Sequence, residues 1–291
     1  MPHTKDQMQR FIFDATDIRG EVVSLEEAYQ TVTEQNPAPR AVQHLLGEFL
    51  AAASLLSSTL KFDGIITLQA RGDGPLSLIM AECDHHKGLR GIANPKPETD
   101  FSELENATMQ ELLGKSVLAI TIDPDKGQRY QGVVPLEEET LAACLEHYFK
   151  QSEQLDTRFW IAVNEQRVSA LMLQALPQQK TNSKEQWETV TTLAETVTPQ
   201  ELLELEHKTL LYRLFHEHEV RLFDSLPVRF SCSCSRARCA HTLATLGPKD
   251  VAELIEEQGK VSIDCQFCKQ HYSFKMSDMA EIFPDQASTL H

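Results

Sequence analysis

Five of the chain's seven cysteines lie in two short stretches near its C-terminus. The first stretch, FSCSCSRARC, ends at Cys239, and the second, CQFC, runs from Cys265 to Cys268. A Cys-x-Cys pair, thirty residues and a Cys-x-x-Cys pair can place four thiolates around one ion, and structural zinc sites favour such a closed tetrahedral set. A module of about 65 residues has little core of its own, so a metal would supply much of its folding free energy. The spacing therefore predicts a zinc module that holds one ion per chain.

The spacing leaves the choice of ligands open. The simplest set is Cys232, Cys234, Cys265 and Cys268, and Cys239 could replace one of the first two. Iron–sulfur ligation and plain disulfides are other uses of clustered thiols. A thioredoxin-like thiol catalyst would need its first cysteine at a helix N-terminus after a strand, whereas strand-like segments flank CQFC on both sides.

The two cysteines outside the cluster suggest no chemistry. Cys144 lies on the apolar face of a predicted helix, where a small buried hydrophobic side chain is the expected role. Cys83 ends a strand-like segment and is assigned no function.

Charge and hydropathy narrow the class of protein. The net charge is −16, whereas nucleic-acid binding normally requires a basic surface. No apolar run is long enough to span a bilayer, and the N-terminus lacks a secretory pattern. We therefore expect a cytoplasmic protein that binds neither nucleic acid nor membrane. Clustered cysteines in that reducing compartment are typical of metal or redox sites.

The remaining motifs do not support an enzyme. The segment LLGKSVL at 112–118 resembles a phosphate loop, but Met109 stands where the pattern needs glycine, and a strand-like run follows instead of a helix. The HEHE run at 216–219 and the pair His85–His86 are typical of solvated polar ends. We expect no ATP site and no catalytic residues.

Hydrophobic periodicity predicts an α+β core domain over residues 1–176. Short strand-like runs with Gly, Asp and Pro between them indicate an antiparallel sheet. The run FIFDATDIRGEVVSL suggests a hairpin that turns near Asp17 and Gly20. Pro39 precedes RAVQHLLGEFLAAASLLSSTL, a long buried helix, and LEEETLAACLEHYFKQSEQL is a second helix.

The rest of the chain divides into a helical linker at 177–226 and the cysteine module at 227–291. In the linker, Thr198, Pro199 and Glu201 form a capping-box pattern. An apolar stripe then follows at helical spacing: Leu202, Leu205, Leu210, Leu214 and Phe215. In the module, PKDVAELIEEQG predicts a helix, and CQFC sits inside a predicted hairpin. The stripe must be covered in a soluble protein, and we expect the core domain and the zinc module to cover it.

Three segments identify a family. These segments resemble the thirty-three-kilodalton heat-shock protein family of redox-regulated bacterial chaperones. They are KFDGIITLQARGDGPLSL, RYQGVVPLEEETLAACLEHYFKQSEQLDTR and the terminal CSC…CQFC. The likeness covers nearly the whole chain in the same order. Members are ATP-independent holdases, inactive when reduced and zinc-bound and active when oxidised.

The resemblance implies specific roles for these residues. The family's zinc ligands fall on Cys232, Cys234, Cys265 and Cys268. Oxidation is expected to form the disulfides Cys232–Cys234 and Cys265–Cys268, to release zinc and to unfold the linker. Unfolding client proteins are the expected partners, with the stripe from Leu202 to Phe215 contacting them, and the oxidised form is expected to be a homodimer. Under oxidative stress the protein would then protect such clients.

Two other classes of protein remain as alternatives. The first is a zinc module that binds nucleic acid or a partner protein; from Pro227 onward it carries seven Lys and Arg against eight Asp and Glu, which does not favour nucleic acid. The second is a thiol oxidoreductase, which would turn over with a small dithiol. Arg236 and Arg238 could favour thiolate at the cluster or could simply be solvated charges.

Overall fold

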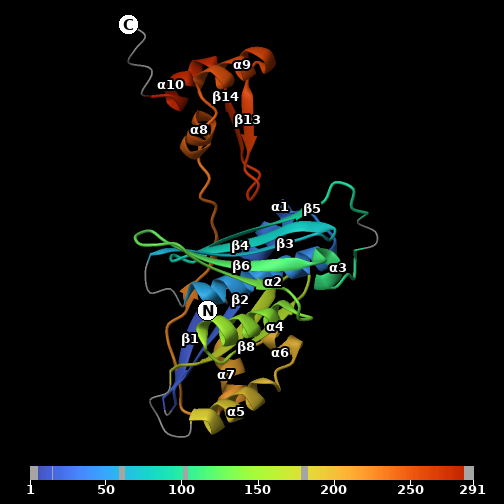
Figure 1. Cartoon of the computed structure of the whole chain (residues 1–291). Coiled ribbons are helices and arrows are strands. Elements are labelled where there is room, and N and C mark those ends of the chain that lie inside the picture. The colour runs from blue at the N-terminus through green and yellow to red at the C-terminus, as the bar shows by residue number, and fades with distance from the viewer. Residues whose placement is uncertain (1–5, 15, 59–62, 101–103, 178–182, 285–291) are drawn as a thin grey trace. The chain divides into compact units, whose positions relative to one another are not determined.

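The computed structural model describes residues 6–14, 16–58, 63–100, 104–177 and 183–284. The chain forms two compact units, residues 1–231 and 232–291 (Figure 1). The first unit includes the segment 183–226, which the sequence separates from the core domain. The second unit begins at the first cysteine of the cluster.

Two six-stranded sheets form the framework of the first unit. The first sheet has the order β10-β1-β2-β9-β8, with β11 also pairing with β1, and the second has the order β12-β5-β4-β3-β6-β7. Every pairing is antiparallel except β12 with β5. The strands are β1 (Gln7–Phe13), β2 (Ile18–Leu25), β3 (Gly64–Gly72), β4 (Leu76–Asp84), β5 (Gly88–Pro95), β6 (Ser116–Pro124), β7 (Tyr130–Pro135), β8 (Thr157–Val163), β9 (Val168–Ala175), β10 (Val220–Leu222), β11 (Leu226–Pro227) and β12 (Arg229–Phe230).

The helices of the first unit pack against these two sheets. They are α1 (Glu27–Gln35), α2 (Arg40–Ser57), α3 (Met109–Leu113), α4 (Leu141–Tyr148), a π-helical turn (Phe149–Glu153), α5 (Ser183–Ala194), α6 (Pro199–Glu204) and α7 (His207–Phe215). The prediction of an antiparallel α+β fold is confirmed.

The central helix α2 joins the two sheets into one core. It begins after Pro39, as predicted, and thirteen of its eighteen residues are buried because Ala and Leu occupy its whole circumference. It packs against β3, β4 and β5 of the second sheet and against β2, β8 and β9 of the first. Gly91 of β5 allows this approach, since a Cβ there would lie 3.0 Å from Leu50.

The predicted hairpin of β1 and β2 is confirmed, with one correction. Gly20 lies inside β2, opposite Phe11, and the turn comes before β2, where the Thr16 N–H donates to the Phe13 carbonyl. A Cβ at Gly20 would lie 2.2 Å from the Phe11 ring. This glycine therefore makes room for an aromatic side chain.

Strand β9 is buried on both faces. Ala170 and Met172 face the core around α2, while Leu171 and Leu173 face the opposite side of the first sheet. A strand covered on one face only would alternate apolar and polar residues. The continuous run VSALMLQA therefore reflects a second covering layer.

Helices α5, α6 and α7 form that second layer. Thr198 caps α6 with the predicted box: its hydroxyl accepts the Glu201 N–H, and the Glu201 carboxylate accepts the Thr198 N–H. The core beneath contains residues of the first sheet and of the linker: Phe11, Phe13, Ile18, Val22, Ala162, Leu171, Leu173, Val190, Ala194, Leu202, Leu210, Leu211, Leu214 and Phe215. Figure 1 shows these helices on the side of the first sheet that faces away from α2.

The second unit has a small core. Its elements are α8 (Arg236–Ala244), α9 (Pro248–Gln258), β13 (Val261–Asp264), β14 (His271–Phe274), a 3-10 turn (Met276–Asp278) and α10 (Met279–Ile282). The β13–β14 hairpin and helix α9, with Gly259 in left-handed conformation at its C-cap, match the predictions. Helix α8 was not predicted.

Candidate metal and redox site

Two loops bring four thiols together in the second unit. Cys232 and Cys234 lie just before α8, and Cys265 and Cys268 lie on the turn between β13 and β14. Their four sulfur atoms lie within 4.8 Å of one another. Sulfur–sulfur contacts cross between the loops, with Cys232 to Cys265 at 3.6 Å and Cys234 to Cys268 at 3.3 Å. The structure therefore places the predicted cysteines in a single cluster.

Backbone geometry fixes the second loop. The Cys265 N–H donates to the carbonyl of Gln270, and the Lys269 N–H donates to the carbonyl of Cys265. Lys269 adopts a left-handed conformation with φ of 57°. This tight turn holds the two cysteines of CQFC on the same side of the hairpin end.

The hydrogen bonds at the cluster differ from one thiol to the next. Burial opposes ionisation of Cys265, but the N–H groups of Cys268 and Phe267 outweigh it and lower the pKa of this thiol to about 7. Burial raises the pKa of Cys268 to about 12 and also raises the pKa of Cys232. A cation would favour thiolate at all four positions, because thiolate is the form that binds metal.

The donor set fits a tetrahedral metal ion. With a zinc–sulfur bond of about 2.3 Å, tetrahedral geometry separates the sulfur atoms by about 3.8 Å. The contacts of 3.3 and 3.6 Å and the 4.8 Å limit for the whole set bracket that distance. In the described part of the chain, this is the one group of three or more Cys, His, Asp or Glu side chains arranged to hold an ion.

The two arginines near the cluster have structural contacts. Arg236 lies over the Phe274 ring at 4.2 Å, donates to the Ser273 carbonyl and pairs with Glu281 at 2.9 Å. Arg238 donates to the Ser233 carbonyl. The guanidinium of Arg236 thus joins the start of α8 to β14 and α10.

Three cysteines lie outside the cluster. Cys239 is buried in α8 within the small core of the second unit. Cys144 is buried on α4, as predicted, and Cys83 is buried on β4. Burial raises the pKa of each of these thiols, which makes them poor nucleophiles at neutral pH.

Sequence reasoning missed one residue at the site. The Tyr272 hydroxyl lies 3.2 Å from the Cys234 sulfur. The only signal was its place in HYSF, two residues after CQFC in a predicted strand. Nothing in that pattern pairs it with a cysteine 38 residues earlier.

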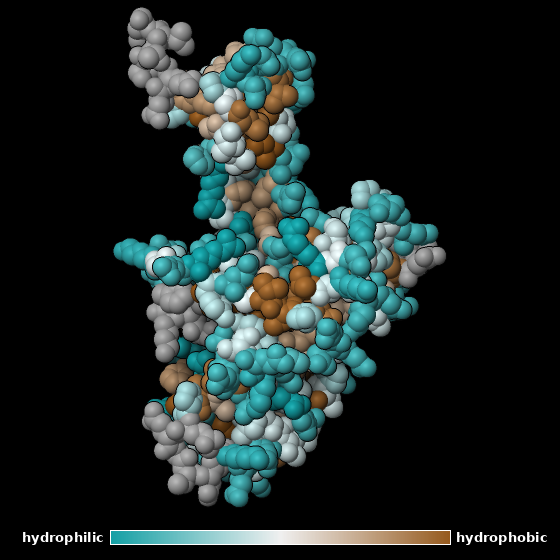
Figure 2. Space-filling model, in the orientation of Figure 1, coloured by the Kyte–Doolittle hydropathy of each residue, from teal (hydrophilic) through white to brown (hydrophobic). Residues whose placement is uncertain are grey.

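The linker stripe packs against the first sheet. Leu202, Leu210, Leu214 and Phe215 are buried, and Leu205 is partly buried. The Phe215 ring lies 5.1 Å from that of Phe13. In Figure 2 the outer surface over α5, α6 and α7 is mainly hydrophilic, with apolar residues showing in small patches.

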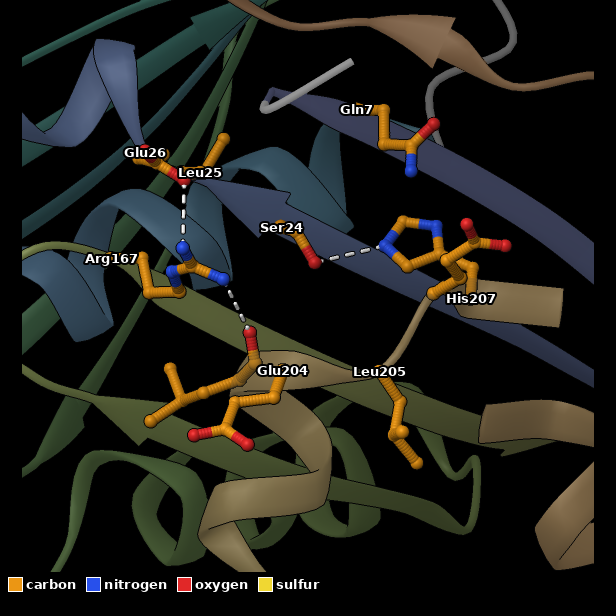
Figure 3. Close-up of a pocket in the computed structure, with 10 residues that line it drawn as sticks. Gln7, Ser24, Leu25, Glu26, Arg167, Glu204, Leu205 and His207 are labelled. Atoms are coloured by element: carbon orange, nitrogen blue, oxygen red, sulfur yellow. Dashed lines mark hydrogen bonds and ion pairs between the residues drawn. The ribbon is translucent and has the colours of Figure 1, made fainter. Parts of the chain in front are cut away.

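A cavity of about 320 Å³ marks the bend between α6 and α7 (Figure 3). On one wall Arg167 pairs with Glu26 at 3.0 Å and donates to the Leu203 carbonyl. On the other, the His207 ring nitrogen Nε2 lies 3.0 Å from the Ser24 hydroxyl. These polar contacts, together with the stripe, hold the linker on the core.

His207 makes this contact sensitive to pH. The residue is 3% exposed, and its buried Nδ1 has no hydrogen-bond partner among the residues that the structure describes. Burial lowers the pKa of His207 to about 4, from an ordinary value of 6.5. Below pH 6.5 the His207 imidazole is therefore protonated when the linker is released from the sheet. When the linker is packed on the sheet, the imidazole stays neutral down to about pH 4. Docking is weakened over that window by about 1.4 kcal/mol per pH unit.

We expect hydrogen-exchange protection factors of 207–215 in the reduced protein to fall about 20-fold from pH 7 to pH 5. His207→Gln should abolish this difference. The cavity beside His207 is also lined by other charged side chains, which are Glu26, Arg167, Glu204 and Glu206. Burial raises the pKa of Glu48, beside α6, to about 7, which acts in the opposite direction. Comparison of the two proteins at each pH isolates His207, and an equal loss of protection in both would contradict the role assigned to His207.

Comparisons with known proteins agree with this arrangement. The family model described as Hsp33 protein matches residues 6–275. A protein of Pseudomonas aeruginosa, strain LESB58, named 33 kDa chaperonin, is 50% identical over 99% of this chain and 97% of its own length. The 33 kDa chaperonin of Azotobacter vinelandii is 49% identical over 96% of this chain and 94% of its own length.

The fold is also that of a solved structure. The crystal structure of the Thermotoga maritima 33 kDa chaperonin, a heat shock protein 33 homolog, has a TM-score of 0.82, with 23% identity over 97% of this chain and 99% of that chain. Within the described residues, no helix has the length and apolar character that crossing a membrane requires.

The chain has an α+β body with a helical layer, and a small unit with four clustered thiols follows in sequence. These features define a protein with a candidate metal and redox site. The chain belongs to the Hsp33 family.

Proposed function

We propose that this protein is a redox-regulated, ATP-independent holdase that binds unfolding proteins under oxidative stress. The four-thiol cluster, with its sulfur atoms within 4.8 Å, is the observation that carries the proposal. The name 33 kDa chaperonin, given to relatives 50% identical, supports the chaperone activity. In the reduced protein, Cys232, Cys234, Cys265 and Cys268 hold one zinc ion and clients are not bound.

The chemistry of the switch follows from the thiols. Zinc, which is redox-inert, keeps its ligands as thiolates at neutral pH when it is bound. A thiolate sulfur attacks hydrogen peroxide, an S–O bond forms, the O–O bond breaks and hydroxide leaves. A neighbouring thiolate then attacks the sulfenic sulfur and displaces hydroxide, which gives a disulfide. The two sulfur atoms together lose two electrons, and hydrogen peroxide accepts these two electrons to give two hydroxide ions.

The proposed disulfides are Cys232–Cys234 and Cys265–Cys268, each within one loop. Sulfur contacts of 3.6 and 3.3 Å cross between the loops, so the pairs Cys232–Cys265 and Cys234–Cys268 are the competing assignment. Proteolysis between the loops separates the two outcomes. Pairing within loops gives separate peptides, whereas pairing across loops leaves the peptides linked until reduction.

Loss of the thiolates is proposed to release the linker. Structural zinc contributes roughly 10–16 kcal/mol of apparent binding free energy to small modules, which is comparable to the stability of a whole domain. From 182 to 226 the linker carries nine acidic against four basic residues, which favours disorder once it leaves the sheet. The stripe and the sheet face beneath it then become available to clients. The oxidised form is proposed to be a homodimer, and the protein to be cytoplasmic.

Light scattering of a thermally unfolding client tests the proposed function. Without ATP, the oxidised protein should suppress aggregation at near-equimolar ratio, and the reduced protein should not. Metal analysis with a chromophoric chelator on the same samples should find about one zinc per reduced chain and release on oxidation. Equal suppression by both forms, or zinc that stays bound after peroxide treatment under mildly unfolding conditions, would contradict the switch.

A further inference from the structure

A tyrosine side chain contacts the four-thiol cluster. Tyr272 lies on β14 opposite Ile263, and its hydroxyl is 3.2 Å from the sulfur of Cys234. This contact joins β14 to the loop before α8, and the two residues are 38 positions apart in the chain. The hydroxyl thus meets the cluster from the small core of the second unit.

The direction of this hydrogen bond depends on the state of the thiol. Between a thiol and a phenol either group could donate. Once Cys234 is a thiolate, as a metal ligand must be, the phenol carries the only proton and must donate it. With a thiolate at Cys234, the contact is therefore an O–H···S hydrogen bond that Tyr272 donates.

Backbone N–H groups provide the equivalent donors for other thiols of the cluster. Cys232 accepts from the N–H of Cys234, Cys265 accepts from those of Phe267 and Cys268, and Cys268 accepts from that of Gln270. These donors come with the loop conformation and no substitution removes them cleanly. At Cys234 a side chain supplies a donor, so this hydrogen bond can be deleted while the backbone is kept.

Packing fixes the position of the phenol. Tyr272 shares a face of β14 with the fully buried Phe274 and belongs to the partly buried rim of the small core. The adjacent Ser273 carbonyl accepts from Arg236, which also lies over the Phe274 ring. The strand and its aromatic rings are thereby held against the start of α8, next to Cys234.

We propose that Tyr272 is a positioning residue for the metal site, whose hydroxyl donates to the Cys234 thiolate and holds it in the four-sulfur arrangement. This inference rests on the proposed zinc site. Outer hydrogen-bond partners of metal ligands typically contribute 10–100-fold to metal affinity. Tyr272→Phe keeps the ring and its packing and removes only the donor.

The test uses the full-length reduced protein, with Tyr212→Phe as the matched control because Tyr212 is 72% exposed and lies on α7, in the other unit. Zinc affinity is measured by competition with a chromophoric chelator. The cobalt-substituted proteins are compared by absorption, where the thiolate-to-cobalt charge-transfer band reports hydrogen bonding at sulfur. Thermal unfolding of the zinc-loaded proteins reports packing.

We expect Tyr272→Phe to bind zinc at least about tenfold more weakly and to shift the charge-transfer band, with the control unchanged. Equal affinity and an unchanged band would overturn the inference. Weaker binding with an unchanged band and a lower unfolding temperature would also overturn it, since the tyrosine would then act through packing alone. Failure of the unsubstituted protein to bind zinc or cobalt would instead remove the proposed metal site itself.

Discussion

Replacing Cys265 with serine is expected to abolish tight zinc binding and to leave the second unit largely unfolded. A serine hydroxyl does not ionise at neutral pH, so the site would keep three thiolates of four. The binding free energy of roughly 10–16 kcal/mol typical of such sites would fall below what the small core needs in order to fold. Zinc content after dialysis measures the first effect, and hydrogen exchange of residues 232–284 within the full chain measures the second.

Two other cysteines provide matched controls for this substitution. Cys239→Ala changes a buried thiol in the same unit, and Cys144→Ala changes a buried thiol in the first unit. Both variants should keep about one zinc per chain. Metal loss in the Cys144 variant equal to that in the Cys265 variant would overturn the ligand assignment.

Replacing Phe215 with alanine is expected to make the reduced protein bind clients without oxidation. Phe215 is 1% exposed, and its ring packs against Phe11 and Phe13 of the first sheet. Removing such a ring costs about 3–5 kcal/mol, which is large for a layer of three short helices. Protection factors of 198–216 should fall, and client aggregation should be suppressed in the reduced state.

Tyr212→Ala is the control for this prediction. Tyr212 lies on the same helix but is 72% exposed, so its loss should leave linker protection and client binding as they are. The idea that the covered stripe holds the protein inactive fails if 198–216 become unprotected while clients remain unbound. It fails equally if oxidation switches client binding on while those amides stay protected.

Much of the framework could be predicted because its signals are local. The long apolar run after Pro39, the capping box at Thr198 and the left-handed Gly259 each follow from adjacent residues. The four cysteines could be grouped because close spacing within each pair limits the geometry. The π-helical turn at 149–153 has no such signal, and the sequence predicts one continuous helix there.

The features that sequence missed depend on contacts between distant segments. Helix α8 is rich in charged and polar residues, so its apolar positions Cys239 and Leu243 form a weak pattern. Strand β10 has three residues and exists because it pairs with β1, some 200 residues earlier. The burial of His207 against Ser24 and the contact of Tyr272 with Cys234 likewise arise only when the chain is folded.

The double burial of β9 makes the linker an intramolecular competitor for the face that clients are proposed to use. Leu171 and Leu173 can be covered by the linker or by a client, but not by both at once. A tethered segment acts at an effective concentration in the millimolar range when its connection is short and flexible. Client affinity in the reduced state is therefore lowered by the docking equilibrium of the linker. The factor by which reduced Phe215→Ala binds a client more tightly than the reduced parent protein would measure that docking equilibrium.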